Sequence, residues 1–167
     1  MSEPPPSQDV ACVFCPPQPP ALLFQDERVW LFRPTLDAHA VQNFHILVVP
    51  KRHIDHVGAL TPDDQHLLRH MREVALFGVL HFSSHPSSFA IMGFHQPFAI
   101  TVSHLHLHVM QAPFSSCARQ RAYLESNAFL SLDMAVWQLQ ELGQIDAGVQ
   151  PDALFKRLQQ RRDEPPD

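Results

Sequence analysis

Glycine is scarce in this sequence, which has five glycines among 167 residues. A phosphate-binding loop of the Walker or dinucleotide-binding kind needs several glycines at fixed spacing, and the sequence contains no such pattern. Any phosphate that the protein binds must therefore be held by side chains or by isolated backbone amides.

Cysteine, basic charge and long apolar runs are also limited. Three cysteines are too few for a disulfide framework. The formal net charge is −5 with neutral histidines, which argues against a general affinity for nucleic acid phosphates. No stretch approaches the roughly 20 apolar residues that cross a bilayer, and the start resembles no secretion signal. We therefore expect a cytoplasmic or nuclear protein that binds neither nucleic acid nor membrane.

The remaining composition suits one compact domain. Hydrophobic residues make up 45% and charged residues 17% of the chain, and a single domain usually has roughly 100 to 200 residues. The two ends differ because both are rich in proline or charge and lack apolar periodicity. We predict disordered tails over residues 1–10 and 161–167, and one domain with a C-terminal helical extension over residues 11–160.

Hydrophobic periodicity predicts the elements of an α+β domain. Five apolar runs have the length and composition of strands, and they cover residues 21–24, 29–32, 45–49, 89–94 and 103–110. Helical spacing predicts a long amphipathic helix over residues 62–82, and two C-terminal helices, one ended by Gly143 and one opened by Pro151. This order predicts an antiparallel sheet of about five strands that helices cover on one face.

Three of the twelve histidines alternate with apolar residues in the segment from His104 through His106 and His108 to Val109. Side chains of a strand repeat their direction every second residue, so the three imidazoles are expected on one face, roughly 6 to 7 Å apart. A lone histidine is usually a hydrogen-bonded polar residue, but three in register indicate a site. Nucleophilic catalysis and metal binding both remain open at this point.

The segment from His104 to Met110 resembles the signature of the histidine triad superfamily. Residues 45–54 resemble the upstream strand of its HINT branch, and the C-x-x-C segment over residues 12–15 resembles the start of many members. Further similarity over residues 93–106 extends the resemblance from about residue 12 to about residue 142. The resemblance implies a HIT-like fold for most of the chain.

Members of this superfamily hydrolyse or transfer nucleoside monophosphates through a nucleotidyl-histidine intermediate. The resemblance implies that His106 is the nucleophile, that His108 holds phosphate oxygens or protonates the leaving group, and that His45 supports them. The chemistry agrees, because a neutral imidazole nitrogen can attack phosphorus directly. We expect a hydrolase of P–N bonds that acts on purine nucleoside phosphoramidates or acyl-adenylates.

The same resemblance implies residues that hold the nucleotide. Thr101 matches the position of a phosphate-contacting serine, and Asp37 matches the offset of a ribose-binding aspartate. Ser103 and Phe14 complete the expected nucleotide and phosphate contacts. Thr101 also suits a strand for its β-propensity alone, and Asp37 also suits an insertion. An asparagine that HINT enzymes carry is absent, with Gly93 near its position.

A structural zinc ion is the one cofactor that we expect. Cys12 and Cys15 have the two-residue gap of a zinc knuckle, although no second pair follows at short spacing. In metal-bearing members of the superfamily, the histidines that match His53 and His104 complete the set. The alternative is two buried cysteines without metal, and Cys117 is expected to be buried and inert.

Other functions remain open. The resemblance also implies a homodimer that binds purine nucleoside monophosphates and their derivatives. A dinucleoside polyphosphate hydrolase is a second enzymatic interpretation, while a two-substrate nucleotidyl transferase is disfavoured because those relatives are about twice as long. A nucleotide-binding scaffold or regulatory protein with little turnover is the alternative from another class.

Overall fold

The computed structural model describes residues 12–15, 21–34, 44–125 and 127–146. Asp37, the two expected tails and the helix expected from Pro151 lie outside the described residues, so those four expectations stay predictions. Within these ranges, no helix has both the length and the apolar character that crossing a membrane requires.

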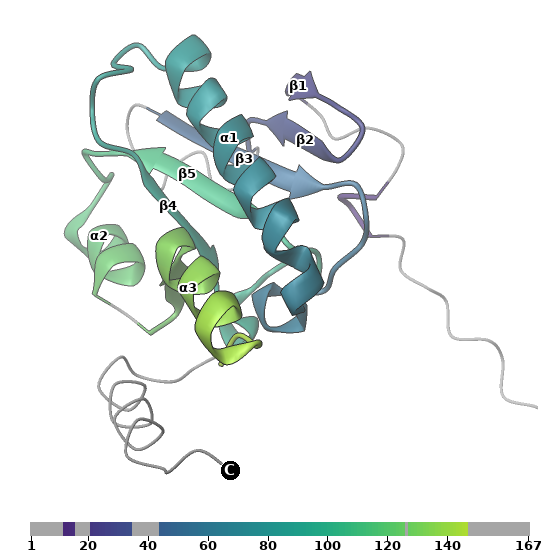
Figure 1. The fold of residues 1–167 in the computed structure, drawn as a ribbon. Helices are drawn as coiled ribbons and strands as arrows, with labels where there is room; N and C mark the ends of the chain where they lie inside the picture. The colour runs from purple at the N-terminus through teal and green to yellow at the C-terminus, as the bar shows by residue number, and fades with distance from the viewer. Residues whose placement is uncertain (1–11, 16–20, 35–43, 126, 147–167) are drawn as a thin grey trace, which may run out of the picture.

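The described residues form a six-stranded sheet with helices (Figure 1). Its strands are β1 (Leu22–Gln25), β2 (Val29–Phe32), β3 (Phe44–Pro50), β4 (Ile91–His95), β5 (Leu107–Gln111) and β6 (Phe129–Ser131). Their order in the sheet is β1-β2-β3-β5-β4-β6, and all neighbours are antiparallel. The helices are η1 (Val57–Ala59), η2 (Pro62–Asp64), α1 (Gln65–Phe82), η3 (Pro97–Ala99), α2 (Cys117–Leu124) and α3 (Leu132–Leu142). The predicted α+β class is confirmed.

The two long helices begin and end at local signals in the sequence. Before α1, the Asp64 carboxylate accepts hydrogen bonds from the backbone N–H and the hydroxyl of Thr61, at 3.0 and 3.1 Å. The α3 helix begins at Ser131, whose hydroxyl accepts from the N–H of Met134, and it ends at Gly143 with φ +69°. These boundaries agree with the long helix and the Gly143 stop that periodicity predicts.

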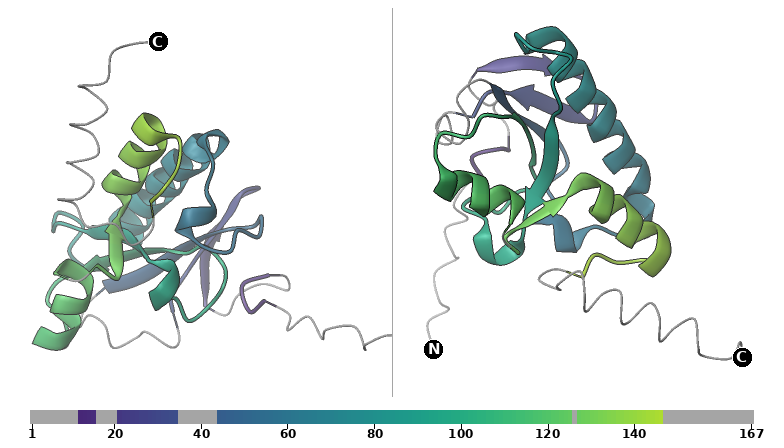
Figure 2. Two further views of the ribbon diagram at one scale, coloured as in Figure 1. Left: turned by 90° about the horizontal axis from the view of Figure 1, so that it is seen from below. Right: turned by 90° about the vertical axis from the view of Figure 1, so that its left-hand side faces the viewer.

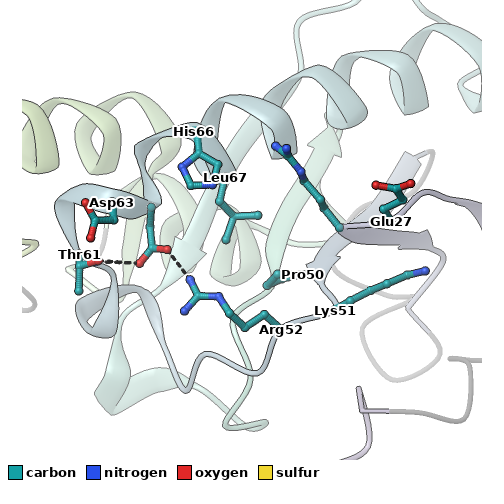
Figure 3. Close-up of a pocket in the computed structure, with 10 residues that line it drawn as sticks. Glu27, Pro50, Lys51, Arg52, Thr61, Asp63, His66 and Leu67 are labelled. Carbon is teal, nitrogen blue, oxygen red and sulfur yellow. Dashed lines mark hydrogen bonds and ion pairs between the residues drawn. The ribbon is translucent and has the colours of Figure 1, made fainter.

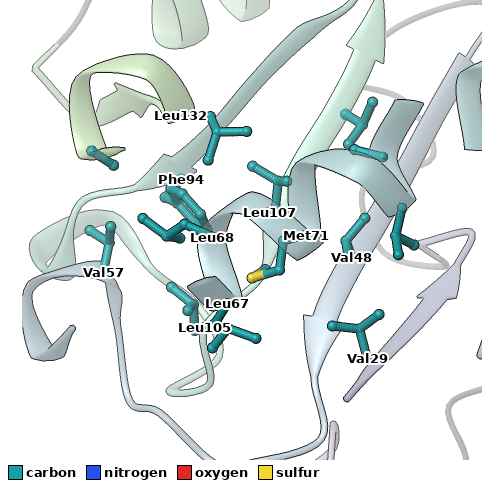
Figure 4. Packing of buried hydrophobic residues seen from close by; sticks show 14 of the residues in the cluster. Val29, Val48, Val57, Leu67, Leu68, Met71, Phe94, Leu105, Leu107 and Leu132 are labelled. Carbon is teal, nitrogen blue, oxygen red and sulfur yellow. The ribbon is translucent and has the colours of Figure 1, made fainter. Parts of the chain in front are cut away.

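The helices α1 and α3 lie on one side of the sheet (Figure 2). Figure 4 shows Leu68 and Met71 of α1 packed among Leu107, Leu105 and other buried side chains of this side. Because side chains alternate along β5, His108 faces the opposite side, where Trp30, Phe32, Leu47 and Val49 form a second cluster. One face of β5 therefore anchors the strand in the core and the other presents the histidine.

The sheet has one strand more than the five that periodicity predicts. Strand β6 has three residues, too few to show periodicity, and it pairs with the outer edge of β4. A Cβ at Gly93 would lie 2.5 Å from the carbonyl oxygen of Leu130 and 2.5 Å from the ring of Phe129. This close approach requires glycine and leaves no room for the asparagine that HINT enzymes carry.

The strand expected over residues 103–110 begins later, at Leu107. Before it, the N–H of Leu105 donates to the carbonyl oxygen of Ile54 at 2.6 Å, outside the ladder with β3. His104 therefore lies in a bend, and His106 lies in the short segment between this bend and β5. Sequence analysis also missed α2, whose first residue, Cys117, is exposed, so the expectation that this cysteine is buried is wrong.

Candidate active site

His106 is oriented by a backbone hydrogen bond. Its ring Nδ1 lies 2.7 Å from the carbonyl oxygen of His104. A carbonyl oxygen can only accept, so Nδ1 carries the proton and Nε2 of the neutral ring carries the lone pair. The residue is 8% exposed, so one edge of the ring is accessible to solvent. The arrangement presents a neutral nitrogen nucleophile.

His108 and His45 form a hydrogen-bonded pair across β5 and β3. His45 Nε2 lies 3.0 Å from His108 Nδ1, and the two rings stack with centroids 5.2 Å apart. One proton lies between these two nitrogens, and if His45 donates it, the proton of His108 is on Nε2. That Nε2 is buried and has no hydrogen-bond partner among the described residues. In that tautomer, the Nε2–H of His108 is available to donate to a bound ligand.

The environment of His108 keeps its ring neutral. Burial lowers its pKa well below the ordinary value of 6.5, and the nearby His106, His45 and His95 lower it further. A charged imidazolium here would be separated from water and surrounded by other imidazoles. At neutral pH, the ring therefore offers one N–H donor without a positive charge.

The expected nucleotide contacts lie at different distances from the histidines. The Phe14 ring lies 5.5 Å from that of His106 and 6.0 Å from that of His104, measured between centroids. Thr101 and Ser103 are exposed in the bend before His104, where the Ser103 hydroxyl donates to Asp55 at 3.4 Å. The structure thus brings Phe14 to the triad, and the two hydroxyls lie exposed in the bend that precedes it.

The four expected metal ligands come together. The ligand atoms of Cys12, Cys15, His53 and His104 lie within 4.8 Å of one another. His104 Nδ1 lies 3.3 Å from the sulfur of Cys12, and His53 Nδ1 lies 3.3 Å from the sulfur of Cys15. Tetrahedral zinc with bonds of roughly 2.0 to 2.3 Å separates its ligand atoms by roughly 3.3 to 3.8 Å. The pairs at 3.3 Å have the spacing of such a site, while the 4.8 Å bound on the whole set is wider, and the donor set of two thiols and two imidazoles suits zinc.

Both histidines of this cluster have outer partners. His53 Nε2 donates to the Asp55 carboxylate at 2.9 Å, and His104 Nε2 donates to the carbonyl oxygen of Pro50 at 2.8 Å. Burial lowers the pKa of His104, which suits a neutral ligand. These bonds fix the tautomer that directs each Nδ1 toward the cysteines, as in carboxylate–histidine–metal arrangements. Sequence analysis did not identify Asp55, whose carboxylate accepts from His53 and from the distant Ser103.

A further histidine that sequence analysis assigned no role lies beside His108. The His95 ring, on β4, packs with its centroid 4.7 Å from that of His108 at 84°. The sequence predicted a strand that ends at residue 94, whereas β4 continues through His95, which places this side chain in the sheet. The residue therefore belongs to the histidine cluster.

A separate cleft of about 540 Å³ lies where the end of β3, the β1–β2 turn and the start of α1 meet (Figure 3). Arg52 forms an ion pair with Asp64 at its wall, while Glu27, Asp63 and Lys51 add further charges. No triad histidine is among the described residues that line it. The cleft is therefore distinct from the histidine cluster.

Comparisons with known proteins place the chain in a family. Residues 11–123 match the family model described as scavenger mRNA decapping enzyme C-term binding. The chain is 32% identical over 142 residues to adenosine 5'-monophosphoramidase HINT3 of Xenopus tropicalis, covering 80% of this chain and 90% of that protein. It is 38% identical over 110 residues to the bifunctional adenosine 5'-phosphosulfate phosphorylase/adenylylsulfatase HINT4 of Arabidopsis thaliana, covering 62% and 72%. A HIT family hydrolase from Clostridium thermocellum has a similar fold, with a TM-score of 0.53, 23% identity, and coverage of 62% and 92%.

The lowered pKa of His108 has a consequence for stability. Below the ordinary pKa of 6.5, the unfolded chain binds a proton at this residue that the folded chain does not, so unfolding becomes easier as pH falls. His108→Asn should reduce the slope of unfolding free energy against pH by up to about 1.4 kcal/mol per pH unit. Urea unfolding between pH 5 and 7.5 measures it, with His66→Asn, an exposed position on α1, as control. Equal slopes in wild type and His108→Asn would contradict the prediction.

Proposed function

The chain belongs to the histidine triad family, in its HINT branch, and we propose that it is a nucleoside 5'-monophosphoramidase that forms a nucleotidyl intermediate on His106. Its proposed substrates are purine nucleoside phosphoramidates and acyl-adenylates, and not nucleic acid polymers. The observation that carries the proposal is the hydrogen bond from His106 Nδ1 to the carbonyl oxygen of His104, because it leaves the lone pair on Nε2. Similarity to an adenosine 5'-monophosphoramidase over 80% of the chain supports it.

In the first step, Nε2 of His106 attacks the α-phosphorus. A P–N bond to His106 forms while the P–N bond of the substrate breaks, and the amine leaves with the electron pair and one proton taken up from solvent. The positive charge that develops on the His106 ring is stabilised by the bond from Nδ1 to the His104 carbonyl. The backbone thus both aims the nucleophile and stabilises the intermediate.

His108 acts in this step as a neutral hydrogen-bond donor. With His45 donating to its Nδ1, the Nε2–H of His108 is available to the departing nitrogen or to a phosphate oxygen. In the second step, water attacks the phosphorus, the bond to His106 breaks, and one proton returns to solvent. The net products are a nucleoside monophosphate and a free amine, with His106 restored.

The remaining nucleotide contacts are proposed because these residues lie near the triad histidines in the structure or in the sequence. The ring of Phe14, near His106, offers an apolar surface for the nucleoside, and the hydroxyls of Thr101 and Ser103 offer donors to phosphate oxygens. Asp37 is proposed as the ribose contact on the resemblance alone.

Substitution of the nucleophile tests the proposed chemistry. His106→Ala should lower turnover of adenosine phosphoramidate by several orders of magnitude while nucleotide binding persists, because it removes the attacking atom and keeps the pocket. His108→Ala should cost less, roughly 10²- to 10⁴-fold. Steady-state kinetics and nucleotide titration measure both, with dinucleoside polyphosphates and aminoacyl-adenylates as competing substrates. Near-normal turnover by His106→Ala would refute attack by this histidine.

We also propose that Cys12, Cys15, His53 and His104 bind one structural zinc ion. The spacing of their donor atoms and the outer hydrogen bonds of both histidines support this assignment. Four protein ligands complete a tetrahedral site and leave no open position for substrate, so the ion would supply rigidity. The ion would hold the ring of His104, and the carbonyl oxygen of His104 orients His106.

Elemental analysis tests the zinc proposal. Untagged protein should contain about one zinc per chain, and Cys15→Ser should lose it, while Cys117→Ser, which changes an exposed thiol outside the cluster, should retain it. A chelator should lower the unfolding midpoint of wild type because the ion binds the folded state. Wild type with far less than one metal per chain and no response to chelator would rule out the site.

A homodimer through the long helix and an edge strand is the proposed assembly. The α1 helix exposes Leu76, Phe77 and Leu80 at 53%, 36% and 64%, an apolar group that a partner helix can cover. Since β6 covers the outer edge of β4, the sheet edges of the described part are those of β1 and β6.

Light scattering with matched variants tests this assembly. Wild type at micromolar concentration should have the mass of two chains, and Leu76→Glu with Leu80→Glu should give a folded monomer because charges would enter the interface. His66→Glu, also on the exposed side of α1, should leave the dimer intact. A monomeric wild type would refute the proposal.

A further inference from the structure

His95 is the last residue of β4, and it lies on the same face of the sheet as His108. Gly93 of β4 pairs with His108 of β5, and His95, two residues further, faces the same side and lies toward His106. On its other edge, His95 pairs with Phe129 of β6. The residue is therefore placed between the triad strand and the segment that follows it in the sequence.

Two aromatic rings contact the half-buried His95 besides His108. Its ring centroid lies 5.1 Å from that of Tyr123 in α2 and 5.5 Å from that of Phe129 in β6, and these two rings contact each other at 5.2 Å. His108 itself lies farther from them, at 5.9 and 6.2 Å. The His95 ring thus fills the space between the aromatic pair and His108.

His45 holds His108 by a hydrogen bond and by stacking on one face of its ring, and His106 lies 4.9 Å away at 60°. The His95 ring makes the closest of these ring contacts, at 4.7 Å and 84°, from the neighbouring strand β4. We propose that His95 is a positioning residue that fixes the ring plane of His108 and, with Tyr123 and Phe129, keeps water away from it. This role rests on the proposed function, in which the Nε2–H of His108 donates to the departing group.

The titratable groups that face His108 are His45 from β3, His95 from β4, His106 from the segment before β5, and Tyr123 from α2. The three imidazoles lower the pKa of His108. Removal of the His95 ring opens a path for water and removes one neighbouring imidazole, so the pKa of His108 should rise toward its ordinary value. A phenylalanine at position 95 retains the aromatic packing and the exclusion of water.

Three variants test the role in a phosphoramidate assay. His95→Ala should lower kcat by about 10- to 100-fold with KM within about threefold of wild type, because a misplaced group affects the transition state more than substrate binding. His95→Phe should recover most of this loss, and His66→Ala, on the exposed side of α1, should match wild type. A kcat for His95→Ala within twofold of wild type would overturn the proposal. A lower kcat/KM in both His95 variants that comes from a raised KM would also overturn the proposal, since it would indicate that His95 contacts the substrate.

A second measurement does not depend on turnover. An NMR titration of the His108 imidazole should give a higher pKa in His95→Ala than in wild type, and little change in His95→Phe. The same pKa in all three proteins would overturn the proposal even if wild type cleaves no phosphoramidate, a result that would refute the proposed function separately.

Should His95→Ala fail to fold, Phe129→Leu removes the opposite side of the packing and should reproduce the loss of kcat and the rise in the pKa of His108. No change in either quantity would count against the role.

Discussion

The hydrogen bond from His106 Nδ1 to the carbonyl oxygen of His104 is the interaction on which the site depends. It selects the tautomer of His106, the proposed nucleophile, and it joins two parts of the molecule through a single residue. The backbone of His104 orients His106, while the His104 ring faces Cys12 and Cys15 and donates to Pro50 at the end of β3. A change that displaces His104 therefore displaces His106 as well.

The protein supports this site by burying histidines against a rigid sheet. His104 and His108 are fully buried, which is unfavourable for polar rings unless they are hydrogen-bonded or neutral. The bonds to Pro50 and His45 and the lowered pKa of His108 meet these conditions. On the other face, Leu107 and Val109 pack beneath α1 and α3, so strand β5 is held by the hydrophobic core and the imidazoles need not stabilise it.

The sequence predicted those features that rest on local periodicity. The long helix, the Gly143 stop and the alternation of histidines with apolar residues each follow from spacing along a few turns or strand residues. Features that depend on distant segments were not predictable in this way. Strand β6 is three residues long and exists through pairing with β4, and the contact of His95 with His108 follows from that same sheet order. The metal cluster was expected only through resemblance, because 38 residues separate Cys15 from His53.

Direct detection of the intermediate tests the central claim, that a neutral His106 attacks the phosphorus. Wild type mixed with a labelled adenosine phosphoramidate is quenched within milliseconds, digested at alkaline pH and analysed by mass spectrometry. The account predicts one acid-labile adenylyl group per reacting chain, located on His106. A turnover-competent enzyme that carries no adenylyl group, or carries it on another residue, would contradict it.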